Sequence, residues 1–455
     1  MDNVFVIALV LYLCVFVLIG VLDLKKIKTF TDYSVAGKNQ SVFAVIMTLT
    51  ATVVGASTTI GITDTVYKIG FPGFWWLAFG ALGLILQSVF LSEKVRRINA
   101  DTLPDLASKT VGSAAEKIIA AIIVISWVGV IAGQLVAMNS LISFALGESN
   151  RVIFFVVSVI VIAYTTFGGQ LSVVKTDKIQ LFIIFTGVVI TLIYLYLVKG
   201  GDTASVAANI ELMNENYTGV NLFTQFFVIG GVYFLGPDIM SRNFISKDEK
   251  TAKNSARVAG VVLFVFAILI TLIGMWIKYN VSAEEMGESG ALMYAISLMP
   301  KGVAVVMIFG LLSAILSSTD TCIINASTIF VKDILKKDSV TGVRISVLVI
   351  GGISLALAML GRGDIMSLLT GAYSIYTPGV IFPLMIAIFA YNKFELRKGL
   401  WLAAVICGGA LGLAGTYFGT ALTAAGVPDV IMGNLSLIGM GISLVLSFCS
   451  IKRGE

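Results

Sequence analysis

Apolar runs of about 20 residues recur from one end of this 455-residue chain to the other, separated by short polar segments. Each run is long enough to cross the hydrocarbon core of a bilayer as a helix. Hydrophobic residues make up 58% of the chain and charged residues only 13%, well below the charged fraction of a soluble domain. The pattern predicts an all-α polytopic membrane protein with one transmembrane domain over residues 1–455.

Hydropathy predicts about thirteen spans. They lie near residues 3–22, 41–69, 73–95, 116–146, 151–167, 174–198, 221–243, 252–280, 302–333, 340–361, 365–392, 398–420 and 429–451. With the N-terminus outside, the segments that face inward hold most of the 31 lysines and arginines. The positive-inside rule therefore predicts a multi-pass protein of the cell membrane, with its N-terminus outside and its C-terminus inside.

Composition also limits the chemistry of the chain. It has no histidine, and its four cysteines are scattered singly, so the sequence offers neither histidine-based nor cysteine-cluster metal sites. It has no phosphate-binding glycine-rich loop. The net charge of +5 is modest and carries no nucleic-acid signature. We therefore do not expect an enzyme or a nucleic-acid-binding protein.

A cluster of polar residues interrupts the apolar span 302–333. Polar side chains inside membrane helices usually face a cavity or the bundle interior. On a helix, Ser317, Ser318 and Thr321 share one face, and Asp320 lies beside Ser317. Hydroxyl and carboxylate oxygens suit a hard cation such as sodium, although a proton or potassium also fits. The alternative interpretation is close packing of small residues between helices.

Two spans contain helix-breaking sequences. The centre of the second span, residues 51–61, is rich in glycine and hydroxyl residues, which lets backbone carbonyls face a cavity. In the seventh span, Pro237 removes a backbone donor. Interruptions at corresponding places in two halves point to a transporter site. The alternatives are a tight helix crossing in the second span and, in the seventh, a helix end with a local Asp238–Arg242 pair.

The order of the spans predicts an inverted repeat. Spans two to six (residues 41–198) and seven to eleven (residues 221–392) form two five-helix units, each beginning with its broken helix. Five is odd, so the second unit enters the membrane from the opposite side. An extra helix (3–22) precedes the repeats, and two C-terminal helices (398–451) follow them.

A predicted turn at residues 165–170 places Asp177 about one helical turn inside the sixth span. Lys175 and Lys178 are its neighbours in the sequence. Asp177 therefore either pairs with one of these lysines at the inner interface or faces inward toward Asp320.

These features together resemble the sodium:solute symporter family, which includes sodium–glucose, sodium–proline, sodium–pantothenate, sialic acid and choline transporters. The matching residues are Ala51, Thr59, Ile60, Gly61, Tyr67 and Gly70; Gly168, Gly169, Thr176, Asp177 and Gln180; Pro237, Arg242 and Lys247 to Lys250; and Ala314, Ser317, Ser318, Asp320 and Asp333. The resemblance implies a leucine-transporter-like five-plus-five inverted repeat and sodium-coupled uptake of a small organic solute by alternating access.

The resemblance also implies a co-transported sodium ion between the second and ninth spans. Its expected ligands are the carbonyls of Ala51, Val54 and Ala314 and the hydroxyls of Ser317 and Ser318. Some members carry a second sodium, for which the matching positions are Asp177, Ser317, Asp320 and Thr321. Members of that kind have hydroxyls where this chain has Asp320, whereas choline-transporter-like members also carry an acid. Two carboxylates would bind a cation more strongly or let one carry a proton, so the stoichiometry stays open.

The expected substrate pocket departs from the better-known members. Thr58 stands where sugar transporters have a glutamine, and Gly236 stands where they have an asparagine and the choline transporter has a tryptophan. This argues against a sugar and weakens the case for a caged quaternary amine. A small amino acid or carboxylate is favoured. The expected pocket residues are Ser57, Thr58, Trp75, Trp76, Trp127, Gln134, Tyr233, Gly236, Asp238 and Tyr376. As an alternative, single aromatic residues in membrane helices serve packing or interface anchoring.

Two other functions use a similar scaffold. A solute sensor would need a signalling partner. A channel fits less well, because broken helices at the membrane midplane are typical of gated carriers. The sequence leaves the oligomeric state open, and a monomer is compatible with it.

Overall fold

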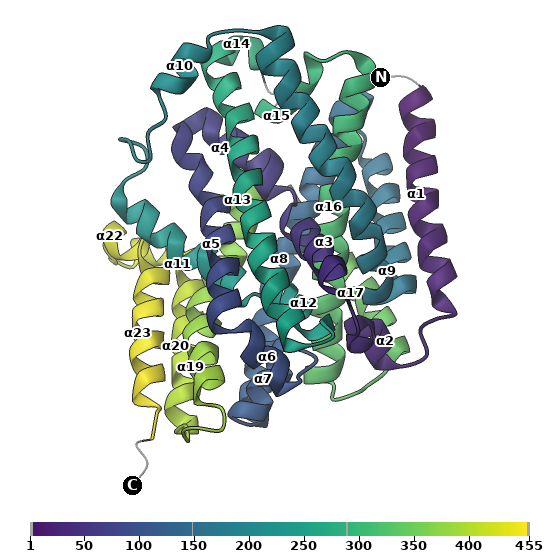
Figure 1. Ribbon diagram of the computed structural model, residues 1–455. Coiled ribbons are helices and arrows are strands. Elements are labelled where there is room, and N and C mark those ends of the chain that lie inside the picture. The colour runs from purple at the N-terminus through teal and green to yellow at the C-terminus, as the bar shows by residue number, and fades with distance from the viewer. Residues whose placement is uncertain (1–2, 148, 288–289, 362, 453–455) are drawn as a thin grey trace.

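The computed structural model describes residues 3–147, 149–287, 290–361 and 363–452, and the regular elements in these ranges are helices. Ten of them are long and apolar enough to cross a membrane, or eleven if one bent pair counts as a span. The long helices run side by side between the upper and lower ends of the molecule (Figure 1). The described part of the chain begins with α1 at the upper end and closes with α23 at the lower end (Figure 1).

The helices of the first half overlap the predicted spans, and one long helix, Arg151–Ile193, covers two of them. They are α1 (Asn3–Leu24), α2 (Phe30–Val35), α3 (Val42–Val53), the short π-helix η2 (Ser57–Gly61), α4 (Ile62–Ile69), α5 (Trp75–Phe90), α6 (Ser92–Ile98), α7 (Leu103–Thr110), α8 (Ser113–Leu146) and α9 (Arg151–Ile193).

The second half continues in the same way. Its helices are α10 (Thr203–Ala208), α11 (Gly219–Leu235), α12 (Pro237–Ile245), α13 (Glu249–Asn280), α14 (Ala283–Met286), α15 (Ala291–Ser297), α16 (Lys301–Ile329), α17 (Val340–Met359), α18 (Ile365–Tyr376), α19 (Phe382–Ala390), α20 (Lys398–Tyr417), α21 (Gly419–Ala424), α22 (Asp429–Met432) and α23 (Leu435–Cys449).

Capping residues fix where several long helices begin. The Ser41 hydroxyl accepts the Ala44 amide at the start of α3, at 3.3 Å. Asp248 accepts the Thr251 amide at the start of α13, at 2.7 Å. Such oxygens satisfy amides that have no partner inside the helix. The start of α3 therefore lies within a residue of the prediction.

Both predicted helix interruptions are present. The segments Val42–Val53 and Ser57–Ile69 of the second span are bent by 61° relative to each other. In the seventh span, Gly236 has extended backbone (φ −71°, ψ 148°) and separates α11 from α12. Pro237 is the first residue of α12, where its missing amide costs no hydrogen bond. Glycine and proline thus break the two helices where the sequence indicated.

The predicted turn at residues 165–170 is wrong in its length. The chain is helical from Arg151 to Lys199, and only Gly169 leaves the helical conformation, with φ 53° and ψ −162°. A Cβ on Gly169 would lie 2.8 Å from the Tyr33 carbonyl. Glycine alone tolerates this backbone and this close approach, so a single residue replaces the predicted turn.

Near residues 92–110 the chain forms two short helices, α6 and α7, and Thr102 caps the second. The Thr102 hydroxyl accepts the Asp105 amide at 3.0 Å, and Pro104 occupies the first turn of α7. Between α6 and α7, the Asp101 carboxylate forms ion pairs with Lys38, at 2.6 Å, and with Lys332 beyond the end of α16. These ion pairs join three distant segments at the lower end of the molecule.

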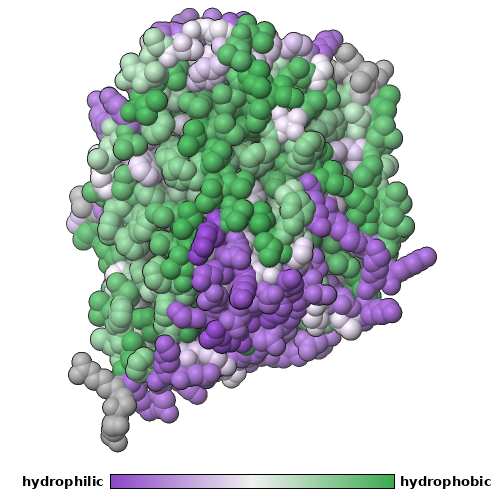
Figure 2. Space-filling model, viewed as in Figure 1, coloured by the Kyte–Doolittle hydropathy of each residue, from purple (hydrophilic) through white to green (hydrophobic). Residues whose placement is uncertain are grey.

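The outer surface carries the apolar side chains that a lipid-facing protein needs. On α1, the side chains of Ile7, Leu11, Leu18 and Leu22 are 57–61% exposed. Hydrophobic residues cover most of the face shown in Figure 2, and hydrophilic residues gather in its lower part, where α2 and α6 lie. The buried core runs continuously through the bundle, with α16 packed between α8 and α9.

Candidate functional site: a cavity between two broken helices

A small cavity of about 20 Å³ lies between the two broken helices. The break after α3 contributes Thr52, Val53 and Ser57 to its wall. The break before α12 contributes Val232, Tyr233, Asp238 and Ile239. The remaining lining residues come from α8, α16 and α18, and they are Val130, Gln134, Ser318, Cys322, Leu369 and Tyr373.

Side chains hold the α3 break open. The Gly55 amide donates to Thr58 Oγ1 at 2.8 Å, and the Ala56 amide donates to Gln134 Oε1 at 3.0 Å. In a continuous helix, each amide would bond to the carbonyl four residues earlier. The carbonyls of Ala51 and Thr52 are therefore released from the helical pattern, as the sequence predicted for this stretch.

The serine face of α16 lies directly against this break. Ser318 Oγ donates to the Thr52 carbonyl at 2.8 Å. A Cβ on Gly55 would collide with Ser318 Oγ, so glycine permits the close approach. The predicted carbonyl ligands Ala51 and Val54, on either side of Thr52, and Ala314, one turn before Ser318, are all fully buried. Four of the five residues predicted for the first sodium site thus lie at or beside this contact.

The fifth, Ser317, faces a different group. Its hydroxyl donates to Asp177 Oδ1 at 2.6 Å, and the hydroxyl of Thr48 donates to Asp177 Oδ2. Arg242 Nη2 lies 3.5 Å from the same Oδ2. Asp177 therefore pairs with neither Lys175 nor Lys178, and Lys175 instead forms an ion pair with Asp23. The predicted pair with Lys175 or Lys178 is therefore wrong. Asp177 instead faces inward toward α16, the helix that carries Asp320, and a cation from α12 also reaches it.

Arg242 is the centre of this buried group. Its Nη2 donates to Thr321 Oγ1 at 2.7 Å and to Thr48 Oγ1 at 3.0 Å, and it also donates to Thr52 Oγ1. Its Nη1 donates to Ser241 Oγ at 2.8 Å. The side chain is 1% exposed. The guanidinium thus lies among the oxygens that a second cation would need, and sequence reasoning did not find this placement.

Asp320 has partners of its own. Its Oδ2 accepts the Tyr164 hydroxyl at 2.6 Å, and its Oδ1 accepts the Thr165 hydroxyl at 2.6 Å. Both donors belong to the first half of α9. The three residues added for a second sodium site are therefore divided: Asp177 and Thr321 contact Arg242, whereas Asp320 bonds to α9.

The structure brings part of the predicted substrate set together. Ser57, Gln134, Tyr233 and Asp238 line the central cavity. Gly236 forms the break beside Asp238, and a Cβ on Gly236 would lie 3.1 Å from Asp238 Oδ1. The Thr58 hydroxyl instead bonds to the backbone of the α3 break.

The aromatic predictions divide into two groups. Tyr376 donates to the Leu235 carbonyl at 2.5 Å, and its ring lies 5.1 Å from that of Trp127, so both support the cavity wall from behind. Trp75 and Trp76 do not line the cavity: Trp75 Nε1 donates to the Leu212 carbonyl at 2.8 Å, and Trp76 is buried in α5. In this structure they hold the packing role that was the alternative interpretation.

Sequence reasoning missed Tyr373 and Cys322 as lining residues. Cys322 lies four residues after Ser318, so helical spacing on α16 was a usable signal for it. Tyr373 lies three residues before Tyr376 on α18, which is a weaker signal of the same kind. Nothing in the local sequence indicated that Arg242 would turn away from Asp238.

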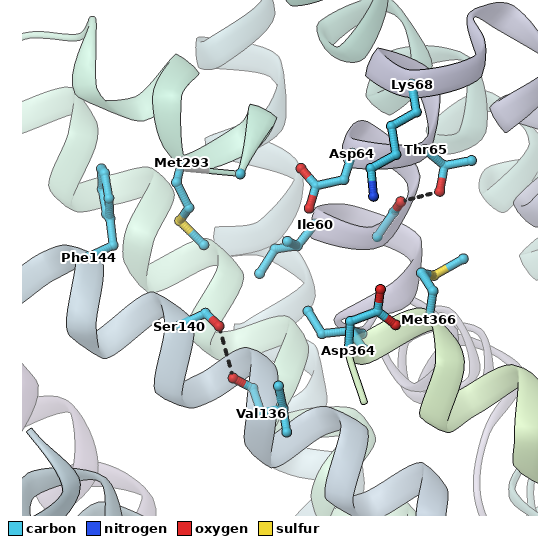
Figure 3. Close-up of a pocket in the computed structure, with 13 residues that line it drawn as sticks. Ile60, Asp64, Thr65, Lys68, Val136, Ser140, Phe144, Met293, Asp364 and Met366 are labelled. Atoms are coloured by element: carbon cyan, nitrogen blue, oxygen red, sulfur yellow. Dashed lines mark hydrogen bonds between the residues drawn. The ribbon is translucent and has the colours of Figure 1, made fainter. Parts of the chain in front are cut away.

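A second, larger cavity of about 610 Å³ lies toward the upper end of the bundle, between α4, α8, α15 and α18. Asp64, Lys68 and Asp364 line it, and Figure 3 shows their side chains around the hollow. Met366 lines this cavity and packs so closely on Gly61 that a Cβ there would collide with its sulfur. This larger cavity, the vestibule, shares no lining residue with the central cavity, although α8 and α18 contribute to both.

Comparisons with known proteins agree on one class. A sequence model described as the sodium:solute symporter family matches residues 33–449. The osmoregulated proline transporter OpuE of Bacillus subtilis (strain 168) is 25% identical over 473 aligned positions, which cover 97% of this chain and 94% of the relative. The sodium/pantothenate symporter of Haemophilus influenzae is 25% identical over 325 positions, covering 67% of this chain and 66% of the relative.

Among solved structures, a sodium-coupled sialic acid symporter in a substrate-bound outward-open state is similar to this chain. The TM-score is 0.81, the sequence identity is 19%, and the match covers all of both chains. The overall folds therefore agree.

Proposed function

Since the chain belongs to the sodium:solute symporter family, we propose that its sodium ion binds where the broken helix α3 meets the serine face of α16. The protein is a multi-pass membrane transporter that couples sodium to the movement of a small organic solute. The proposal adds where the ion and the solute bind, and which class of solute is carried.

The observation that carries the sodium assignment is the contact of Ser318 with the Thr52 carbonyl, at 2.8 Å. It places a hydroxyl of α16 beside backbone that has left the helical hydrogen-bond pattern. Carbonyl and hydroxyl oxygens are the ligands that hard cations prefer. Sodium here would be held by Ala51, Val54, Ala314 and Ser318, with Ser317 completing the set after its hydroxyl turns from Asp177.

We further propose that one sodium is coupled in each cycle. The predicted second site rests on Asp177, Asp320 and Thr321. Arg242 supplies a positive charge to Asp177 and donates to Thr321, and Asp320 bonds to the hydroxyls of Tyr164 and Thr165. The guanidinium of Arg242 therefore supplies the positive charge that a second sodium ion would supply.

Coupling follows from shared residues. Thr52 and Ser318 belong to the proposed sodium contact and also line the central cavity. An ion that holds α3 against α16 would order the wall that the solute touches, and the solute would strengthen ion binding by the same factor. Sodium entry supplies about 2.3 kcal/mol per charge for each 100 mV of membrane potential.

The finer topology is also proposed. Counting the bent second span once, the long helix α9 as two spans joined at Gly169, and α23 as one gives thirteen spans. We keep the N-terminus outside and the C-terminus inside, which places the vestibule on the outer side. Within this arrangement, the inverted repeats are residues 41–198 and 221–392, preceded by helix 3–22 and followed by helices 398–451.

The substrate class favoured is a small amino acid or carboxylate. The cavity wall combines hydroxyl, amide and carboxylate groups from Ser57, Gln134 and Asp238 with two tyrosines. Among the lining residues there is no tryptophan and no run of sugar-binding amides. A relative that covers most of the chain is a proline transporter by name, which agrees with this class.

The test is uptake into proteoliposomes that contain the purified protein. Radiolabelled small amino acids and carboxylates are offered with an inward sodium gradient, an equal potassium gradient, or none. The proposal predicts accumulation above equilibrium only with the sodium gradient, and a sodium Hill coefficient near one. Equal accumulation without sodium, or no accumulation of any solute in these classes, would contradict it.

A further inference from the structure

Asp238 carries the only formal charge among the described residues that line the central cavity. The other polar groups around it are hydroxyl, amide and thiol groups, which are neutral. Its Oδ1 is buried and has no hydrogen-bond partner among the described residues. A buried carboxylate oxygen without a partner destabilises the folded protein, so this group favours a ligand that supplies positive charge and hydrogen-bond donors.

The backbone positions this carboxylate at the cavity. Gly236 is extended and Pro237 begins α12, so Asp238 lies in the first turn of a nine-residue helix. The positive end of the helix dipole favours a negative charge at this place. The helix break therefore presents an anionic group to the cavity, and among the described residues no side-chain cation is in ion-pair contact with it.

The nearest cation in the sequence, Arg242, is engaged elsewhere. Its Nη2 donates to Thr48 and Thr321, and its Nη1 donates to Ser241. In the described part of the chain, no hydrogen bond or ion pair joins Arg242 to Asp238. The local Asp238–Arg242 pair expected as one alternative from the sequence is thus absent, and the charge of Asp238 faces the cavity.

We propose that Asp238 binds the ammonium group of the transported solute, so that the substrate is an amino acid or another solute with a protonated amine. This inference rests on the proposed function and narrows it. A carboxylate without an amine would bring a second negative charge into a closed cavity, which disfavours it. An ammonium group offers three donors to Asp238, and the aromatic rings of Tyr233 and Tyr373 in the same wall add cation–π attraction.

The size of the cavity adds a second restriction. At about 20 Å³ it holds little more than one water molecule in this conformation, so the cavity must widen before a solute enters. Leu369 and Tyr373 of α18 line the cavity, and Met366 of the same helix borders the vestibule. We therefore expect a compact solute whose amine lies close to its other polar groups.

The experiment compares ligand pairs that differ only at the amine. The purified full-length protein is heated in sodium chloride with L-alanine or L-lactate, L-valine or 2-hydroxyisovalerate, and L-proline or tetrahydrofuran-2-carboxylate. Ligands that bind the native state raise its melting temperature. At least one amine-bearing member is expected to raise it, and its partner without the amine is not.

The same titrations are then made with Asp238→Asn, Asp238→Glu and the control Asp338→Asn, which changes an exposed aspartate in an inner loop. Asp238→Asn is expected to weaken the amine-bearing ligand at least about tenfold, Asp238→Glu to retain the preference for the amine, and Asp338→Asn to match the wild type. If Asp238→Asn does not fold, the selectivity of the wild-type protein between the paired ligands decides the outcome.

Three results would overturn the inference. One is equal stabilisation of the wild type by both members of every pair. Another is unchanged affinity for the amine-bearing ligand in Asp238→Asn. A third is a variant that loses its response to sodium alone but keeps its ligand preference, which would make Asp238 an ion ligand. If the amine preference is present but independent of sodium, Asp238 keeps its role and the proposed coupling fails.

Discussion

Arg242 has an unusual position for its charge. Among the described residues, it is the one lysine or arginine whose side chain is fully buried, and it joins α12 to α3, α9 and α16 through three threonines and Asp177. Burying a charge is costly unless it is paired and hydrogen bonded. Arg242 is paired with Asp177, and both of its terminal nitrogens are hydrogen bonded, although its Nε has no partner among the described residues. The guanidinium thus acts as a permanent cation in a transporter that otherwise binds its cation from solution.

Arg242→Gln should be strongly destabilising. It leaves the Asp177 carboxylate buried without its cation, and breaking a buried pair costs about 3–5 kcal/mol. We expect a clear fall in the melting temperature relative to the wild type and to Arg257→Gln, which changes an exposed arginine on α13. High sodium should restore part of the loss, because the vacated oxygens suit a cation. A variant as stable as the wild type would contradict this role.

The substitution Asp320→Asn tests whether the Asp320 carboxylate, unlike that of Asp177, has only a structural role. Asp320 accepts hydroxyls from Tyr164 and Thr165, and an amide would oppose one of these donors with its own NH₂ group. We expect a loss of about 1–3 kcal/mol in unfolding free energy, as for a buried hydrogen-bonding group that loses its partner. The sodium midpoint in a thermal titration should stay within a factor of two. A tenfold shift of that midpoint would place Asp320 at the ion.

At the scale of helices, the interruption of α9 depends on one residue. Gly169 has φ 53°, and a Cβ there would press on Tyr33. Gly169→Ala should lower the unfolding free energy by about 2–3 kcal/mol through backbone strain and collision. Gly352→Ala is the matched control, since it is helical, exposed and has open space around it. Equal melting temperatures for the two variants would show that the interruption is not strained.

The ion pairs at the lower end of the bundle should respond to pH. Burial would raise the pKa of Asp101, but the hydrogen bonds and charges of Lys332 and Lys38 lower it further, so the net pKa lies below its usual value. Because the folded-state pKa is depressed, this stabilisation is present above about pH 4 and is lost as the pH falls through the folded value. Asp101→Asn should cost about 1 kcal/mol at pH 7. The gap in melting temperature should close below about pH 4, and a gap independent of pH would contradict it.

The elements differ in how well the sequence predicted them. Hydropathy, Ser41 and Pro237 act locally, so most of the apolar helices and both helix breaks could be predicted from sequence alone. The interruption at Gly169 is shorter than the predicted turn because it depends on a tertiary contact with Tyr33. Trp75 and Trp76 were assigned to the pocket because tryptophans that pack between helices and tryptophans that bind a ligand look alike in the sequence.

The partners of Arg242 come from three other helices, more than 60 residues away along the chain. No local pattern in α12 contains that information. Whether a guanidinium turns toward Asp238 on its own helix or toward Asp177 on α9 depends on how the bundle packs. The sequence could therefore name most of the oxygen groups of the site, but not how they are shared between Arg242 and a bound ion.

At the scale of the whole molecule, the two cavities and the proposed ion contact lie within one bundle. A wide vestibule lies on the proposed outer side, a small cavity lies between the two helix breaks, and the ion pairs of Asp101 join segments at the opposite end. The proposed ion contact touches the cavity through Thr52 and Ser318. In this account, sodium and the solute stabilise the same arrangement of α3 and α16, which is the requirement for coupled transport.

The most direct test of the account is a sodium titration of the melting temperature of the purified protein, with potassium as the comparison ion. We predict that sodium, and not potassium, stabilises the wild type. Ser318→Ala should shift the sodium midpoint at least about tenfold, or about 1.4 kcal/mol. Ser327→Ala, which changes a buried hydroxyl on the same helix, should leave the midpoint unchanged. Equal stabilisation by both ions, or an unchanged sodium midpoint in Ser318→Ala, would contradict a sodium site at the contact of α3 and α16.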